Sequence, residues 1–437
     1  MMKDERGLPL TAESSAAVAA IDFFVAKFAR IERGVEAILD AARVFPATPT
    51  IPLCAAAFCL FGQTRDADAA AKAYLEAAEP LLPSAHERER RLHAAFSRWL
   101  LKDHLGAVTL LEEITETHPR DILAIKIAEF IYYVLGQQHE GPRFLRHMER
   151  LAAANAGDPD FLAAHGFAHE LCGHADLAER LAEEALAQDL RVPWAHQCLA
   201  HFDLRRGEAE AGVRRLEALL PLWMGAGRVI HCHNAWHLAV AYVERLGLDE
   251  AEALLRRHVW GVTPDLTVEQ LDAIALAWRI EMAGRRLDDI WPSLAESVAP
   301  RIDVCYMPFI TVHQAFALAR AGKEELVVRC VARARARFEA EDREARRSWF
   351  AGLAMIEAAA AYGRGEPAEC AKRLGPVIET VTVGGGSDAQ VGLLRQTFLC
   401  SLIESGRKSE ASAYWRQETA GKKLTQLDRH WLRIAEK

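Results

Sequence analysis

Apolar residues recur along most of the chain every three to four positions, which is the spacing of one face of an α-helix. Short breaks at Gly, Pro or Asp interrupt the pattern, and we find no run with the strict alternation of a half-buried strand. The pattern therefore predicts a chain of helices joined by short loops. The clearest predicted helices cover residues 19–40, 86–101, 122–135, 160–172, 177–188, 194–205 and 235–246.

The breaks also reveal a repeat. Gly173 and Gly207 lie 34 residues apart, and each separates two predicted helices. This is the period of the tetratricopeptide repeat, a helix–turn–helix unit that stacks on its neighbours. Small residues such as Gly166 and Gly212 stand where the two helices of a unit must approach closely. The clearest repeat units cover residues 160–258.

We therefore expect an all-α fold, a tetratricopeptide-like helical-repeat solenoid built as a curved array of antiparallel helix pairs. No low-complexity linker splits the chain, so residues 1–437 are expected to form one continuous domain. In such an array each unit contacts mainly its neighbours, and the first helices of the pairs line a concave face. That face is either an open groove or the wall of a closed central pocket.

Composition narrows the classes of function. Hydrophobic residues make up 51% of the chain, which is ample for a buried core. The net charge of −8 gives no general attraction for nucleic acid or anionic lipid, so we expect neither a nucleic-acid nor a membrane partner. The longest apolar runs, such as residues 51–61, are too short to span a bilayer. Because the chain also starts without a signal-peptide pattern, we expect a cytoplasmic protein.

Histidine is the residue most unevenly distributed along the chain. His165 and His169 are four residues apart, as are His233 and His237, so each pair shares a helix face. Two imidazoles on one face provide half of a site for Zn²⁺ or another transition metal. Eight of the 17 histidines lie within residues 165–237, mostly on the first helices of three consecutive units: His165, His169, His174, His196, His201, His231, His233 and His237.

Three explanations of this cluster stay open. The histidines are hydrogen-bonded packing residues, or they line a polar pocket for a small ligand or for acid–base chemistry, or they hold a metal. The metal candidates are His165, His169, His233 and His237. The candidates for ligand binding or acid–base chemistry are His196, His201, His233, Asn234, Trp236, His237 and Glu170. Because no catalytic motif is complete, the catalytic residues stay unknown at this stage.

Several segments match, in order, those of a known family. They are Glu87-Arg88-Glu89-Arg90, His118-Pro119-Arg120-Asp121, Trp194-Ala195-His196, Cys232-His233-Asn234-Ala235-Trp236-His237, Asp272 with Trp278-Arg279, and Gly385-Gly386-Ser387-Asp388-Ala389-Gln390. Together they resemble the tetratricopeptide repeat protein 38 family over residues 5–415, and no single motif carries the resemblance. The resemblance implies a helical-repeat fold, names no shared activity, and adds His313 to the ligand-binding or acid–base candidates.

The chain also departs from the pattern of that family. His165 and His169 lie outside it, which weakens the metal hypothesis that depends on them. A polar site common to the family would be altered in this chain, because acidic or polar residues are lost at three places together. These residues are replaced by Leu255-Arg256, Ile310-Thr311 and Val391-Gly392.

Two functions follow as hypotheses. The first is a binding protein whose concave groove or pocket, lined by His and Trp, holds a peptide or a small ligand, because repeat arrays of this kind mostly bind. The second is an enzyme with a His-rich, metal-dependent or acid–base site in a central cavity. A homo-oligomer assembled through apolar end helices is a structural alternative. In the first two cases we predict that His233 and His237 project from one face near His196 or His201.

Overall fold

The computed structural model describes residues 2–341 and 346–437. The chain divides into two compact units. The first comprises Met1–Leu135, Glu140–Cys198 and Leu222–Ile230, and the second comprises Gly136–His139, Leu199–Pro221 and His231–Lys437. The expectation of one continuous repeat domain stays a prediction.

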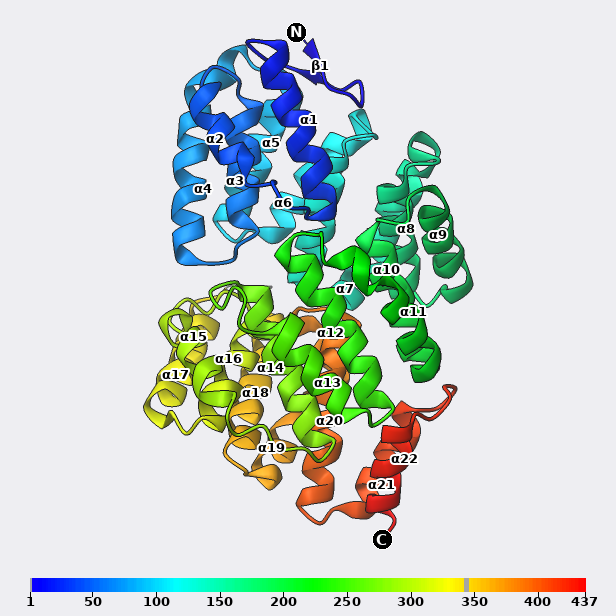
Figure 1. The fold of residues 1–437 in the computed structure, drawn as a ribbon. Helices are drawn as coiled ribbons and strands as arrows, with labels where there is room; N and C mark the ends of the chain where they lie inside the picture. Colours follow the sequence, from blue (N-terminus) through cyan, green and yellow to red (C-terminus); the bar gives the residue numbers. More distant parts are fainter. Residues whose placement is uncertain (1, 342–345) are drawn as a thin grey trace. The chain divides into compact units, whose positions relative to one another are not determined.

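The regular structure in the described residues is almost entirely helical, which confirms the all-α fold (Figure 1). The helices before residue 190 are α1 (Ser15–Arg30), α2 (Ala37–Val44), α3 (Thr50–Leu60), α4 (Arg65–Ala78), α5 (Glu87–Leu100), α6 (His104–Thr117), α7 (Ile122–Leu151), α8 (Pro159–Leu171) and α9 (Ala175–Gln188). Two-residue strands β1 (Met2–Lys3) and β2 (Pro9–Leu10) pair antiparallel near the N-terminus.

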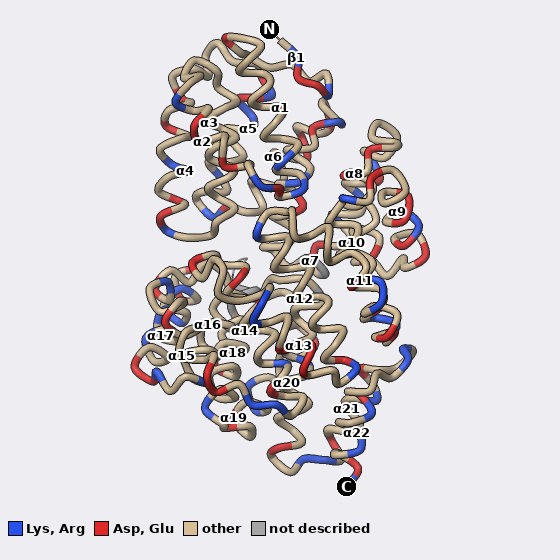
Figure 2. Tube along the Cα trace, viewed as in Figure 1, with Lys and Arg blue, Asp and Glu red and all other residues tan. Residues whose placement is uncertain are grey.

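The helices after residue 190 are also joined by short loops, and positive and negative residues are interspersed along them (Figure 2). None of the helices within the described ranges combines the length and the hydropathy needed to cross a membrane. They are α10 (Pro193–Arg206), α11 (Ala209–Trp223), α12 (Arg228–Glu244), α13 (Leu248–Leu254), α14 (Thr267–Met282), α15 (Trp291–Val298), α16 (Pro308–Arg320), α17 (Glu324–Ala340), α18 (Arg346–Gly363), α19 (Pro367–Leu374), α20 (Asp388–Glu404), α21 (Lys408–Glu418) and α22 (Gln426–Ala435). Short 3₁₀ or π segments are η1 (Glu79–Ser84), η2 (Ala152–Asn155), η3 (Leu255–Val259), η4 (Ala299–Arg301) and η5 (Gly375–Gly384).

Consecutive helices form antiparallel pairs of the tetratricopeptide type, for example α8 with α9 and α16 with α17 (Figure 1). Helix α8 begins at Pro159 and α10 begins at Pro193, 34 residues later. A Cβ added at Gly166 of α8 would lie 3.0 Å from the carbonyl oxygen of Ala178 on α9. Only a residue without a side chain allows the two backbones to approach so closely. The small positions of the repeat therefore have the packing role that the sequence predicted.

Some predicted boundaries were wrong. The predicted helix 19–40 is two helices. Helix α1 ends at Arg30, because the next residue, Ile31, adopts a left-handed conformation with φ 49°, and α2 starts only at Ala37. The predicted helix 122–135 ends at the correct place, because Gly136 takes a non-helical φ of 98° and kinks α7 there. Periodicity alone missed the turn after α1 because apolar spacing continues across it.

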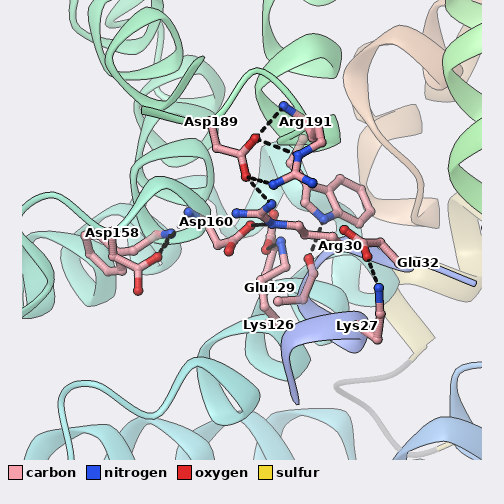
Figure 3. A network of polar contacts seen from close by, with 12 residues as sticks. Lys27, Arg30, Glu32, Lys126, Glu129, Asp158, Asp160, Asp189 and Arg191 are labelled. Carbon is pink, nitrogen blue, oxygen red and sulfur yellow. Dashed lines mark hydrogen bonds and ion pairs between the residues drawn. The ribbon is translucent and has the colours of Figure 1, made fainter. Parts of the chain in front are cut away.

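A polar network in the first unit fastens the end of α1 (Figure 3). The Nε of Arg30 lies 2.7 Å from Asp160 on α8, and its NH1 lies 2.6 Å from Asp189, which follows α9. Arg191 also donates to Asp189, at 3.1 Å. The indole of Trp194 donates to the carbonyl oxygen of Ala29 at 2.7 Å. Arg30 therefore joins segments that lie more than 120 residues apart in the sequence.

Helix α14 lies in the core of the second unit. Its residues from Thr267 to Ile280 are buried almost without exception, so the helix is covered on all sides. Trp278 stacks face to face on Phe316 of α16 with ring centroids 3.6 Å apart. Three charged residues, Glu269, Asp272 and Arg279, interrupt this buried helix. Charged side chains are rarely buried without a specific partner or role, so they mark the place where a site is to be sought.

Candidate functional site

The first unit contains four of the candidate residues. Glu170 is fully buried on α8. His165 and His169 face each other on that helix with ring centroids 4.7 Å apart, as their spacing predicted. Burial lowers the pKa of His165 to about 4, so this ring is neutral at pH 7.

His196 also belongs to the first unit, and both of its ring nitrogens are in use. Nε2 lies 2.9 Å from the carbonyl oxygen of Leu190, which a protonated nitrogen can donate to. Nδ1 accepts a hydrogen bond from the indole of Trp223 at 3.0 Å. These contacts favour the packing explanation for His196, because neither nitrogen is left to meet a ligand.

The second unit brings together four other candidates, from helices α10 and α12. His237 lies beside His201 with ring centroids 4.8 Å apart, and beside His233 at 4.7 Å. Trp236 stacks on His233 at 5.4 Å with nearly parallel rings. His237 is fully buried, and burial together with the neighbouring His233 and His201 lowers its pKa well below the usual range. At pH 7 the cluster therefore contains a neutral, buried imidazole at its centre.

His233 is held by a carboxylate from α14. Its Nδ1 lies 3.0 Å from one oxygen of Asp272 and 3.3 Å from the other. The thiol of Cys232 donates to the same carboxylate at 3.7 Å and to the carbonyl oxygen of Val259 at 3.4 Å. Since an ionised carboxylate only accepts hydrogen bonds, the proton of His233 is on Nδ1. This carboxylate–imidazole contact defines the tautomer and the orientation of the His233 ring.

Arg279 lies about two helical turns after Asp272 on α14. Its guanidinium carbon is 5.3 Å from the ring centre of Trp236. One terminal nitrogen donates to the carbonyl oxygen of Ala389 at 2.8 Å. Its Nε and its other terminal nitrogen, both buried, have no hydrogen-bond partner among the described residues. Burial lowers the pKa of Arg279 to about 10, so the side chain is still a cation at neutral pH.

Glu244, the last residue of α12, is the second buried charge of this region. Its carboxyl accepts hydrogen bonds from the amide of Gln396 at 3.0 Å and from the hydroxyl of Thr425 at 2.8 Å. Burial raises the pKa of Glu244, and the negative Asp428 adds to this shift. The cations Lys422 and Arg279 do not offset this burial, so the carboxyl ionises less readily than it would in water.

Glu244 and Arg279 line one pocket of about 320 Å³ within the second unit. Two further charges of its wall are paired, since Arg395 lies 3.3 Å from Glu418. The remaining wall comes from α10, α12, α20, α21 and the loop before α22: His201, Leu204, Arg205, Val240, Ala389, Gly392, Gln396, Trp415, Ala420, Gly421 and Lys422. Of the candidate residues, His201 is thus the one that reaches the pocket wall.

Two more candidates lie in the second unit, apart from this wall. Asn234 is buried on α12. His313 is buried on α16, and its Nδ1 lies 2.8 Å from the carbonyl oxygen of Phe309. Burial lowers the pKa of His313 to about 4. Because Nδ1 donates to that carbonyl, Nε2 is an acceptor, and it has no hydrogen-bond partner among the described residues.

The positions at which the chain departs from the family pattern have different surroundings. Leu255, Ile310 and Val391 are buried apolar residues. Gly392 lines the pocket, and a Cβ added there would meet no atom within 4 Å. The pocket is therefore open at the position where the resemblance implies an acidic side chain.

No metal site is apparent in the parts of the chain that the structure describes, where no three His, Cys, Asp or Glu side chains are placed to hold one ion. His165 with His169 supplies two imidazoles, as does His233 with His237. A catalytic zinc needs three protein ligands and a structural zinc needs four. The metal hypothesis for these histidines stays a prediction without a third ligand.

Sequence reasoning missed Glu244, Gln396 and Lys422, and it used Asp272 and Arg279 only as landmarks. A signal was present for some of them. Arg279 follows the apolar stretch 273–278, and Glu244 ends the apolar stretch 238–243. A charge placed inside an apolar helix indicates either a buried ion pair or a site.

No protein-family model matches the chain. Two solved structures are similar to it. The human IFIT1 dimer with m7Gppp-AAAA is 12% identical, with a TM-score of 0.43 over 100% of this chain and 95% of that one. A tetratricopeptide repeat protein from Parabacteroides merdae is 10% identical, with a TM-score of 0.25 over 80% of this chain and 99% of that one. The helical-repeat fold of this chain rests on its own helix pairs.

Proposed function

We propose that this chain is a helical-repeat binding protein whose second unit holds a small molecule by a negatively charged group. One observation carries the proposal: the buried cation Arg279, with two nitrogens unpartnered among the described residues, lies in the wall of an open pocket. A volume of about 320 Å³ is at the lower end of the range for small-molecule sites. This size favours a small ligand over an extended peptide.

The energetics support an anion. A buried donor without an acceptor destabilises a protein by about 1–3 kcal/mol, and more when the donor is charged. Arg279 has two such donors, and its charge is also taken out of water. A carboxylate or phosphate oxygen would accept these hydrogen bonds as charge-assisted ones, which are about twice as strong as neutral hydrogen bonds.

Gly392 provides the sharpest test. We expect Gly392→Asp to place a carboxylate in open pocket space, where it competes with the anion for Arg279. Gly392→Asn has the same volume without the charge, and Gly392→Ala adds only a methyl group. All three substitutions lie inside α20, where the backbone is helical and needs no glycine.

The measurement is isothermal calorimetry of the full chain with acetate, succinate, inorganic phosphate and a set of larger carboxylic acids. At least one acid should bind, and Gly392→Asp should weaken it tenfold or more relative to Gly392→Asn. Binding to Gly392→Ala should stay within threefold of the wild type. If none of these anions binds, or if Asp and Asn at this position act alike, the proposal is wrong.

The Asp272–His233 pair favours acid–base catalysis as a second candidate function, in which the ring of His237 lies between His233 and the pocket residue His201. A carboxylate that orients an imidazole through Nδ1 is the arrangement of many general bases. Mass spectrometry of each binding compound after incubation would test it. We expect a changed compound with the wild type and an unchanged one with His233→Gln. Recovery of every compound unchanged from the wild type would remove this candidate.

A further inference from the structure

The pocket of the second unit contains two buried charges of opposite sign that are not in direct contact. Glu244 is 4% exposed and Arg279 is 3% exposed. Glu244 accepts from the neutral donors Gln396 and Thr425, and Arg279 donates to a backbone carbonyl. Among the described side chains, no ion pair joins the two. Both line the same pocket and attract each other at longer range, but neither forms an ion pair with a described side chain.

Other charges near Glu244 are already matched. Lys422, from the loop before α22, lies 3.6 Å from Asp428, and Arg395 on α20 lies 3.3 Å from Glu418 on α21. These pairs leave Glu244 and Arg279 as the deeply buried charges of the pocket. Burial raises the pKa of Glu244 and lowers that of Arg279, and the attraction between the two charges does not outweigh this effect of burial.

We propose, building on the proposed function, that the ligand is a small zwitterion of the amino-acid class, with its carboxylate on Arg279 and its ammonium group on Glu244. A plain acid would compensate Arg279 and leave Glu244 without a cation. A plain amine would do the reverse. A zwitterion compensates both charges at once. Because Glu244 and Arg279 are already withdrawn from water in the folded protein, only the desolvation of the ligand opposes the new contacts.

The residues around the two charges suit such a molecule. Leu204, Val240 and Trp415 give the pocket an apolar portion that can receive the hydrocarbon part of an amino acid. The hydrogen bonds from Gln396 and Thr425 fix the carboxyl of Glu244 in position before a ligand arrives. A preorganised acceptor of this kind raises affinity because little side-chain freedom is lost on binding.

Calorimetry with matched compounds tests the inference on the full chain. The probes are the twenty common amino acids, with β-alanine and γ-aminobutyrate added to vary the distance between the two charges. The tightest binder is then compared with the same molecule without its amino group and with the same molecule without its carboxylate. We expect the zwitterion to bind at least tenfold more tightly than either analogue.

The variant Glu244→Gln keeps the shape of the side chain and removes its charge. It should weaken the zwitterion at least tenfold and leave the amino-free acid within threefold of its wild-type affinity. A second readout needs no variant. Because bound ammonium stabilises ionised Glu244, binding of the zwitterion should release protons, seen as different heats in buffers of different ionisation enthalpy, whereas the amino-free acid should release none.

The outcomes separate this inference from the proposed function. If plain acids bind as tightly as amino acids and no proton release accompanies the latter, the zwitterion inference is overturned and the anion pocket stands. If amine and zwitterion bind equally, the assignment of the carboxylate to Arg279 is wrong. If neither acids nor amino acids bind, both proposals fall.

Discussion

The carboxylate of Asp272 accepts a hydrogen bond from Nδ1 of His233 at 3.0 Å and joins α14 to α12 in the second unit. The carboxylate is 1% exposed, and the thiol of Cys232 donates to it as well. One side chain thus satisfies two donors of the neighbouring helix. Its loss has consequences both for stability and for the orientation of the histidine cluster.

We predict that Asp272→Asn lowers the free energy of unfolding by about 1–3 kcal/mol, because buried polar groups lose a charged acceptor. Urea denaturation followed by circular dichroism gives the value. The matched control is Asp289→Asn, whose side chain is 65% exposed and pairs with Arg256 at the surface. We expect a loss below about 1 kcal/mol there. Equal losses in the two variants would contradict a structural role for the buried pair.

Gly207 is predicted to control the docking of the loop before α22. Its φ is +70°, and an added Cβ would lie 1.7 Å from the carbonyl oxygen of Lys423. The amide of Lys423 also donates to the carbonyl oxygen of Arg206 at 3.0 Å. Gly207→Ala must therefore displace this loop, which supplies Gly421 and Lys422 to the pocket wall.

Gly406→Ala is the control for this substitution, because Gly406 has a similar φ of +79° but open space around an added Cβ. The control should lose about 1–2 kcal/mol through backbone strain alone. Gly207→Ala should lose more, and hydrogen exchange should accelerate in residues 419–425. Equal stability and unchanged exchange in the two variants would show that the loop does not depend on Gly207.

Arg30→Met is predicted to destabilise the first unit in a pH-dependent way (Figure 3). Hydrogen bonds from Arg191 and Arg30 hold the pKa of Asp189 well below its usual value. A lowered carboxyl pKa gives stability that is present above the unfolded pKa and is lost as pH falls. We expect the variant to be about 1–3 kcal/mol less stable at pH 7. Unfolding measured from pH 7 to pH 2 should show a steady difference above the ordinary carboxyl pKa of 3.8 and a shrinking difference below it. A difference that stays constant down to pH 2 would contradict the assignment.

Glu244→Gln is predicted to remove a contribution to stability that decreases as pH rises, which is opposite in sign to the contribution of Asp189. Burial raises the pKa of Glu244, so the folded state holds a proton more tightly than the unfolded state. This contribution is fully present below the unfolded pKa and is lost as pH rises through the folded pKa. Between pH 4.5 and pH 8 the wild type should therefore lose stability relative to the variant. Thermal unfolding of the two proteins across that range measures the difference. Parallel curves of stability against pH would refute the prediction.

The helical-repeat fold follows from local patterns in the amino-acid sequence. Apolar residues at helical spacing and small residues such as Gly166 at the crossing points are local signals, because each depends on one helix and its neighbour in the chain. The same local signals placed His233 and His237 on one helix face, and the structure has their rings 4.7 Å apart. The histidine cluster was thus recognisable before any coordinates.

Which polar residues share a pocket depends on contacts that form when the chain folds. Glu244, Arg279 and Gln396 come from three helices, and nothing in their spacing along the chain relates them. The tertiary structure also separated histidines that looked alike, since His196 uses both ring nitrogens in packing whereas His201 reaches the pocket wall. The physical reason is that burial, charge compensation and hydrogen-bond partners depend on neighbours brought together by folding, whereas helix formation depends mainly on neighbours in sequence.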